Sequence, residues 1–420
     1  MASIEREPSQ VSNRMMLFEL SIYGHHSTYI QHLVRYWCEN TLSGCFYLVV
    51  ASQFMEKHAD VVSIAEQYPD ANVFFLPLSE TEEASLTANT SNFFYRKARA
   101  WQEWNLMCAY ASKWQVSHCF LDSFDFFQWP FLLSKKPPCP ISGIYFKPTF
   151  HYSTFATHVA TPKTYAQQWQ EKLTLAAIFR QPSLHRLFCI DPFAVDALNS
   201  SFAQGKAVSL ADPISTYPAQ SKSSELREQL KIDESRKVFL LFGDLTSRKG
   251  VDQLLEAITQ LPTSLCHQLC VLLVGRCSSS VKLSLQPKIN QIRQNQSVQI
   301  IEHYEFVSEQ AVQDYFQLAD VVLAPYQKHI GMSGILLQAA AARKPVLSSN
   351  YGLMGELVYR YQLGLAVDST QPSELAKGLS QLLRKPLAQF YSSAKMEQLV
   401  QQNTIEKFAG TIFDELSIQL

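Results

Sequence analysis

The sequence predicts an α/β protein made of two doubly wound domains, each built on a parallel sheet. Short apolar runs alternate with helical patterns along most of the 420-residue chain, which is typical of consecutive β-α-β units. The chain is also longer than one hydrophobic core usually supports, so two domains of about 150–200 residues are expected. A polar stretch near the middle of the chain separates the two halves.

The first half contains five predicted strands and three predicted helices. Each strand is a short apolar run, and each helix shows apolar residues at intervals of three and four. The predicted strands are Met15–Ile22, Phe46–Ala51, Val73–Leu76, His118–Leu121 and Ile141–Phe146, and the predicted helices are Thr28–Asn40, Val61–Gln67 and Phe93–Gln115.

The second half shows the same alternation more regularly. The predicted strands are Val238–Phe242, Cys270–Val274, Val298–Glu302, Val321–Pro325 and Pro345–Ser348. The predicted helices are Gly250–Gln260, Ser279–Asn295, Glu309–Ala319, Gly334–Ala342, Met354–Tyr361 and Pro372–Arg384, and 388–416 is mostly helical. No sequence repeat links the halves, so their similarity is architectural.

The predicted boundaries follow from these patterns. Residues 1–14 form a polar tail, 15–200 the first domain, and 238–387 the second. Residues 201–237 are rich in Ser, Ala, Gln, Pro and Lys, and we interpret them as the connection between the domains. We expect the last segment, 388–420, to be a helix that returns toward the N-terminal domain.

Composition excludes several classes of protein. With 36 basic and 37 acidic residues the net charge is −1, and nucleic-acid binding would normally leave a basic surplus. The first 14 residues lack the apolar run of a signal peptide, and no window of about 18 apolar residues exists, so we expect no membrane span. The nine cysteines are scattered through apolar stretches, which favours free thiols in the cytoplasm. Cys266 and Cys270 form a lone CxxxC, so we expect no metal site.

Three loops of the second half follow predicted strands and suit phosphate binding. Gly331, Ser333 and Gly334 precede an alanine-rich helix, and helix N-termini present unpaired N–H groups to anions. Ser333 is equally compatible with a plain helix cap. Arg248 and Lys249 lie in the loop that starts at Gly243, where two cations can clamp a diphosphate or form a solvated turn. Gly275 marks a third turn after the next strand.

The order of these motifs resembles the C-terminal half of group 1 (family 4) retaining glycosyltransferases, which have the GT-B fold. The resemblance covers about residues 238–385 and includes the Gly-x-Leu-x-x-x-Lys-Gly loop at 243–250, Val274-Gly275, Ala319-Asp320 and Lys344-Pro345-Val346. It implies two Rossmann-like domains that face each other across a cleft. The N-terminal domain is then the acceptor side, and the C-terminal domain binds a nucleotide sugar.

Three positions depart from the family's pattern. Its paired glutamates, which contact the donor sugar and the ribose, align with Ile330 and Gln338. The amide of Gln338 can still bind a ribose hydroxyl, whereas Ile330 cannot replace a carboxylate. The arginine that the family has in the first loop falls at Asp244, with Lys249 retained and Arg248 placed to compensate.

In the first half, the resemblance singles out three loops. Thr149-Phe150-His151 resembles the family's Thr-Phe-His element, whose histidine contacts the donor sugar, so His151 is a candidate catalytic residue. Gly24, followed by His25 and His26, occupies the place of the family's glycine-rich loop. Asp122 follows a strand and is either an acceptor ligand or a turn residue. The dense aromatics of 93–129 are mostly core, with a platform for an acceptor or a membrane as the alternative.

We therefore predict a glycosyltransferase that moves a sugar from a nucleoside-diphosphate donor to an unknown sugar, lipid or small-molecule acceptor with retention. Cations and the helix start replace a metal, so neither a metal nor a further cofactor is expected. The alternatives are a catalytically silent GT-B protein that binds a sugar nucleotide or a protein partner, and an epimerase or phosphorylase of the same architecture.

Overall fold

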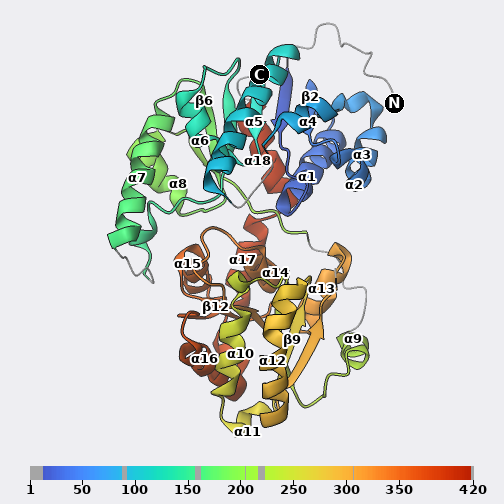
Figure 1. Ribbon diagram of the computed structural model, residues 1–420, viewed down its shortest axis with the longest axis vertical. Helices are drawn as coiled ribbons and strands as arrows, with labels where there is room; N and C mark the ends of the chain where they lie inside the picture. The colour runs from blue at the N-terminus through green and yellow to red at the C-terminus, as the bar shows by residue number, and fades with distance from the viewer. Residues whose placement is uncertain are drawn as a thin grey trace. The chain divides into compact units, whose positions relative to one another are not determined.

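The computed structural model describes residues 13–87, 92–156, 162–203, 205–215, 223–305 and 307–417. The chain divides into two compact units, each with its own sheet (Figure 1). The first unit comprises 1–150, 162–213 and 405–420, and the second comprises 151–161 and 214–404. The predicted tail, 1–14, lies outside the described residues except for its last two positions.

The first unit contains a seven-stranded parallel sheet in the order β3-β2-β1-β4-β5-β6-β7. Its strands are β1 (Arg14–Phe18), β2 (Cys45–Val50), β3 (Val73–Pro77), β4 (His118–Leu121), β5 (Ile141–Tyr145), β6 (Leu184–Cys189) and β7 (Ala207–Ser209). Its α-helices are α1 (His25–Glu39), α2 (Phe54–Lys57), α3 (Ala59–Glu66), α4 (Glu80–Ser85), α5 (Phe93–Lys113), α6 (Phe124–Leu133), α7 (Pro162–Phe179), α8 (Ala194–Leu198) and α18 (Ile405–Ser417).

The second unit contains a six-stranded parallel sheet in the order β10-β9-β8-β11-β12-β13. Its strands are β8 (Lys237–Phe242), β9 (Leu269–Val274), β10 (Gln299–His303), β11 (Val321–Ala324), β12 (Val346–Ser349) and β13 (Gly364–Val367). Its α-helices are α9 (Ser223–Gln229), α10 (Val251–Thr259), α11 (Thr263–Cys266), α12 (Ser279–Asn295), α13 (Glu309–Leu318), α14 (Gly334–Ala341), α15 (Gly352–Arg360), α16 (Pro372–Arg384) and α17 (Ser393–Gln402).

Burial explains why these segments are strands. Every residue of β2 and of β9 is buried, as expected for central parallel strands that helices cover on both faces. The buried residues of helices α10, α11, α12 and α16 form one core with strands β8 to β12 of the second sheet. The prediction of two doubly wound α/β domains is therefore confirmed.

Several segments, including α7, β6 and β13, were not predicted from the sequence, and three further segments differ from the expectation. Strand β1 ends at Phe18 and not at Ile22, because the Glu19 carboxylate accepts a hydrogen bond from the Ser21 N–H at 2.6 Å and the chain turns there. Strand β7 lies inside the predicted connection, pairs with β6, and extends the first sheet. The last predicted helix is two helices, of which α17 belongs to the second unit and α18 packs on α1 of the first.

Both sheets have the Rossmann strand order, in which the direction of winding reverses beside the first strand. The reversal lies between β1 and β4 in the first unit and between β8 and β11 in the second. Ligands of such sheets bind beyond the carboxyl ends of the two strands at the reversal. The topology thus marks one candidate site in each unit.

Candidate functional site

In the second unit, glycines bring the loops after β8 and β9 into close contact. Gly243 and Gly275 both have positive φ angles, +106° and +122°. A Cβ atom on Gly275 would lie 2.4 Å from the Gly243 carbonyl oxygen, so only glycine allows the two turns to pack this tightly. Two of the predicted phosphate-binding turns therefore lie side by side.

Lys249 occupies the centre of this edge of the sheet and is 6 % exposed. Its ammonium group donates to the Phe242 carbonyl oxygen at 3.1 Å and contacts the Tyr326 hydroxyl. Nζ also lies 4.3 Å from the centre of the Tyr326 ring. Within the described ranges no carboxylate pairs with Lys249, so this buried cation has only neutral oxygens and a ring around it.

Arg248 lies beside Lys249 and is exposed. Its guanidinium group is 5.3 Å from the Tyr326 ring centre, and Nη1 lies 2.9 Å from His329 Nδ1. His329 Nε2 is 3.1 Å from the Met332 carbonyl oxygen. A carbonyl can only accept, so Nε2 carries the proton and Nδ1 accepts from Arg248. Two cations and the loop before α14 are thus held together through Tyr326 and His329.

Asp244, which stands where the family has an arginine, binds an arginine of the neighbouring turn. Its two carboxylate oxygens accept from Arg276 Nε at 2.9 Å and from Nη2 at 3.0 Å. Both side chains are mostly exposed. The paired arrangement places a second guanidinium group, after that of Arg248, beside the turns at Gly243 and Gly275 and neutralises the charge of Asp244 there.

The loop before α14 supplies the third predicted phosphate contact. Gly331 has a φ of +94°, and nothing lies within 4 Å of a Cβ placed on Gly334, so the helix start is open. Ser333 is the N-cap residue, but its side chain makes no capping hydrogen bond. Gln338, one turn into the helix, is half-buried, as is Ile330 before it.

The segment that begins at His151 packs with the second unit and not with the first, to which our predicted boundaries assigned it. Tyr152 is 1 % exposed, and its hydroxyl accepts from the Gly331 N–H at 3.3 Å. A Cβ atom placed on Gly352 would lie 2.9 Å from the Tyr152 ring. The buried His151 ring lies 5.2 Å from that of Tyr152. Tyr152 therefore anchors His151 beside the loop before α14.

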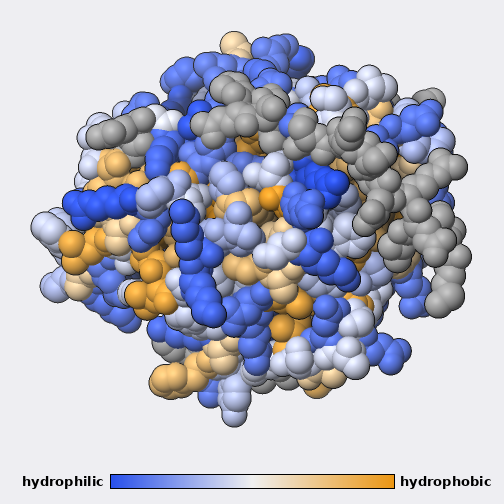
Figure 2. Space-filling view, turned by 90° about the horizontal axis from the view of Figure 1, so that it is seen from above, coloured by the Kyte–Doolittle hydropathy of each residue, from blue (hydrophilic) through white to orange (hydrophobic). Residues whose placement is uncertain are grey.

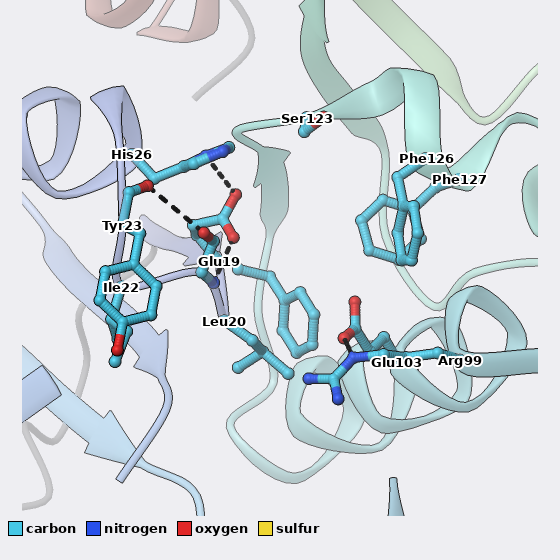
Figure 3. A pocket seen from close by; sticks show the side chains of 12 residues that line it. Glu19, Leu20, Ile22, Tyr23, His26, Arg99, Glu103, Ser123, Phe126 and Phe127 are labelled. Carbon is cyan, nitrogen blue, oxygen red and sulfur yellow. Dashed lines mark hydrogen bonds and ion pairs between the residues drawn. The ribbon is translucent and has the colours of Figure 1, made fainter. Parts of the chain in front are cut away.

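In the first unit, His26 joins two carboxylates at the reversal of the sheet. Its Nδ1 lies 2.6 Å from Asp122 Oδ2 and 2.9 Å from Glu19 Oε2. Burial alone would lower the pKa of His26, but the hydrogen bonds to Asp122 and Glu19 raise that pKa to about 10. His26 is therefore a cation at neutral pH. Figure 3 shows its ring pointing at the Glu19 carboxylate.

Asp122 is fully buried, and its Oδ1 has no hydrogen-bond partner. We predicted an acceptor ligand or a turn residue, whereas the carboxyl group holds His26 and cannot meet a ligand directly. Burial raises the pKa of Asp122 above its usual range. Gly24 is the N-cap of α1 with a φ of +74°, which brings His25 and His26 into the first turn of the helix.

His25 is the neutral neighbour of this cluster. Although His25 is partly exposed to solvent, desolvation by its neighbours lowers its pKa to about 3, and the positive charges of His26 and Lys147 add to the effect. The ring packs on His26 and Phe146. His25, His26 and Asp122 offer three ligand atoms within 4.8 Å of one another. A metal ion could bind them only if His26 lost the proton that it shares with the two carboxylates.

The cluster predicts a pH-dependent stability. Because the pKa of His26 is about 10 in the folded chain and 6.5 in the unfolded chain, its contribution is complete below pH 6.5 and is lost as the pH rises through 10. We expect the free energy of unfolding to fall between pH 7 and 10 by at least about 1 kcal/mol more in the wild type than in His26→Gln. Urea unfolding at both pH values measures the difference, and equal pH dependence would contradict it.

Two residues of the candidate sites, Glu19 and Tyr326, were not predicted from the sequence. Glu19 directly follows an apolar strand, a position that in a parallel sheet points to a site, and this signal could have identified it. Tyr326 follows β11 in the same way, but its contact with Lys249 spans 77 residues and has no local signature.

The aromatic residues of 93–129 differ in burial. Of these aromatic residues, Trp104, Phe124 and Phe127 are buried in the core of the first unit, and Trp101, Trp114 and Phe126 are half-buried. Phe94, Tyr95 and Trp129 are exposed, and the side chain of Phe93 lies outside the described part of the chain. No described helix is both long and apolar enough to cross a lipid bilayer.

Comparison with known proteins identifies relatives of both sequence and fold. Residues 222–404 match the family model of glycosyl transferases group 1. The lipopolysaccharide glucosyltransferase WaaG of Escherichia coli (strain K12) is 29 % identical over 185 residues, which cover 42 % of this chain and 46 % of WaaG. The match thus spans about half of that relative.

Solved structures match nearly the whole chain. HepE of Anabaena, in complex with UDP and glucose, has a TM-score of 0.64 at 14 % identity and covers 97 % of this chain and 100 % of its own. Sucrose-phosphate synthase from Thermosynechococcus elongatus has a TM-score of 0.69 at 15 % identity, and the match covers 97 % of this chain and 100 % of the synthase chain. Together with the two parallel sheets, these matches show the GT-B fold.

Proposed function

We propose that this chain, whose residues 222–404 match the family model of glycosyl transferases group 1, transfers a sugar from a nucleoside-diphosphate donor to an acceptor hydroxyl with retention of configuration. The observation that carries the proposal is the buried ammonium group of Lys249, which has no carboxylate partner among the described residues. Burial of an unpaired charge is unfavourable, so the site is completed by an anion. A donor diphosphate supplies that charge at the reversal of the sheet.

Each group around Lys249 has a role in this proposal. Lys249 and Arg248 neutralise the diphosphate as the bond to the sugar breaks, and the N–H groups at the start of α14 bind its oxygens. Gln338 holds the ribose. Because these groups stabilise the departing diphosphate, the proposed reaction needs no metal. His151, held by Tyr152 beside the same loop, meets the donor sugar.

In the first unit, we assign the acceptor side to His26 and Glu19. Asp122 acts as a positioning residue, since its buried carboxyl group contacts His26 and not the solvent. The protonated His26 cannot accept a proton near neutral pH, so its role here is to orient Glu19 and the acceptor and not to act as a base.

The test is a transfer assay with nucleotide sugars. HepE was solved with UDP and glucose, which makes uridine diphosphate hexoses the first donors to try. We expect wild-type chain to release nucleoside diphosphate from one donor, faster with a mixed acceptor pool, and NMR of the product to show the donor's anomeric configuration. An inverted product would contradict retention, and lack of release from every donor would contradict transfer.

One observation favours a second candidate, a GT-B protein that binds a sugar nucleotide without turnover. Ile330 occupies the position of the carboxylate that contacts the donor sugar in the family, and an aliphatic side chain cannot hydrogen-bond it. Saturable nucleotide binding without release from any donor would select this candidate. Replacement of Ile330 by glutamate would then be expected to create or raise turnover.

We also propose a peripheral membrane contact on α7. Tyr165, Trp169 and Leu173 recur every four residues along this helix and are all more than half exposed. Lys163 lies at one end of this row, and Figure 2 shows apolar side chains gathered on the left, the side on which α7 lies in Figure 1. An apolar row with a flanking cation suits an anionic lipid surface. Co-sedimentation with anionic but not zwitterionic vesicles, lost in Trp169→Ser, tests this contact.

A cytoplasmic location also remains part of the proposal. All nine cysteines are free, and seven of them are buried. Chains with this many unpaired thiols are typical of reducing compartments.

A further inference from the structure

A pocket of about 330 Å³ lies in the first unit, beside the cluster of His26 and Glu19. It is bounded by the end of β1 and the loop after it, by the first turn of α1, and by one face each of α5 and α6 (Figure 3). The volume falls within the range of small-molecule sites, at its lower end, and suits a single ring.

The polar lining is dominated by two buried carboxylates. Glu19 Oε1 accepts from the Ser21 N–H and Oε2 faces His26, while Glu103 Oε1 accepts from Arg99 Nε at 2.6 Å. Burial raises the pKa of Glu103 to about 7, against the opposing charge of Arg99, and repulsion from Glu19 adds to the rise. The negative charges of Glu19 and Glu103 therefore repel each other across the pocket.

The cations of the pocket are already engaged. Arg99 donates Nε to Glu103 and Nη1 to the Thr87 carbonyl oxygen at 3.1 Å, and His26 is held by Glu19 and Asp122. An anionic ligand would therefore have to compete with Glu103 for Arg99, and with Glu19 and Asp122 for His26. Hydroxyl and amino groups, in contrast, donate hydrogen bonds to carboxylates, and such charge-assisted bonds are strong.

The remaining wall is aromatic. Figure 3 shows the rings of Phe126 and Phe127 on one side of the pocket and His26 with Glu19 on the other. The ring centres of Phe126 and Phe127 are 5.3 Å apart, and the two rings are nearly perpendicular, in an edge-to-face arrangement. A sugar ring has one apolar face of C–H groups and a rim of hydroxyls, and it matches an aromatic wall opposite carboxylates.

We propose that this pocket binds a sugar ring of the acceptor, one that carries hydroxyl or amino groups and no negative charge. The inference rests on the proposed transfer function and adds the chemical class of the acceptor. Glu103 and Glu19 are its specificity-determining residues, because they accept from the ring substituents and repel phosphate and carboxylate groups.

Ligand-observed NMR with four matched glycosides tests the pocket. The ligands are methyl glucoside, methyl glucosaminide, methyl glucuronide and methyl glucoside 6-phosphate. We expect the neutral and amino glycosides to bind the wild type and the two anions to bind at least about tenfold more weakly. In Glu103→Gln, the amino glycoside loses about tenfold in affinity and the anions gain. Glu66→Gln, an exposed change on α3, is the matched control.

Nucleotide binding by the same samples separates this inference from the proposed function. If uridine diphosphate still raises the melting temperature of Glu103→Gln, the variant is folded and its donor site is intact. Should Glu103→Gln not fold, Phe126→Leu removes the aromatic wall instead and is expected to weaken both favoured glycosides. Equal binding of anionic and neutral glycosides, or no effect of either variant, would overturn the acceptor assignment. Loss of nucleotide binding in the wild type would instead overturn the proposed function.

Discussion

Lys249→Met is expected to lose most of its affinity for nucleoside diphosphates without losing stability in the free state. A hydrogen bond to a charged group contributes about 1.5–3 kcal/mol, so the dissociation constant should rise by about 10- to 100-fold. Replacement of an unpaired buried cation by an apolar side chain of similar length is neutral or stabilising. The ligand-free variant should therefore unfold at the wild-type temperature or above it.

Thermal unfolding with and without uridine diphosphate measures both effects. At a ligand concentration 100 times the dissociation constant, binding stabilises a protein by about 2.7 kcal/mol, and a 100-fold weaker site reduces this to about 0.4 kcal/mol. Lys377→Met, which removes an exposed cation on α16, is the control and should behave like the wild type. An unchanged ligand response with a less stable free protein would show that Lys249 is structural.

Gly250→Ala is expected to be among the most destabilising single changes in the second unit. Gly250 has a φ of +73°, and a Cβ placed on it would lie 2.0 Å from the Pro325 carbonyl oxygen and 2.8 Å from Gln327 Nε2. The backbone must move away from β11, which displaces Lys249. We expect a cost of at least about 3 kcal/mol, since strain and overlap add.

Gly205→Ala separates the cost of backbone strain from the cost of steric overlap. Gly205 has a similar φ of +88°, but nothing lies within 4 Å of a Cβ placed there. Only the left-handed backbone is strained in this variant, which costs about 1–2 kcal/mol. Urea unfolding of the two variants compares them directly. Equal losses of stability would show that the contact with Pro325 is not what requires glycine at 250.

The sequence predicted the strands of the second half better than those of the first. Strands such as β9 are fully buried runs without polar interruption, and their apolar pattern identifies them. Strand β6, in contrast, carries His185 and Arg186 within it. Arg186 Nε donates to Glu415 at 2.7 Å, a partner 229 residues away on α18. A polar strand residue stabilised by so distant a partner leaves no local signal.

The candidate sites, too, were predictable only where a residue has a local sequence signal. The Arg248-Lys249 pair and the glycine turns were predictable, since strand ends in a parallel sheet mark ligand sites. Their partners were not, because Tyr326 and His329 reach them from the loop after β11. In the first unit, His26 and Asp122 are 96 residues apart, and the sequence indicates each of them only as a separate site residue. Only the fold shows that they form one cluster with Glu19.

The most direct test of the central claim is hydrogen exchange of the backbone amides with and without uridine diphosphate. The account predicts slower exchange in the loop at 243–250, at the turn around Gly275, and at the start of α14 from Gly331 to Leu336. Exchange in α11, which precedes β9 and therefore lies at the opposite, amino edge of the sheet, should not change. Protection confined to other segments, or none at saturating nucleotide, would contradict a nucleotide site around Lys249.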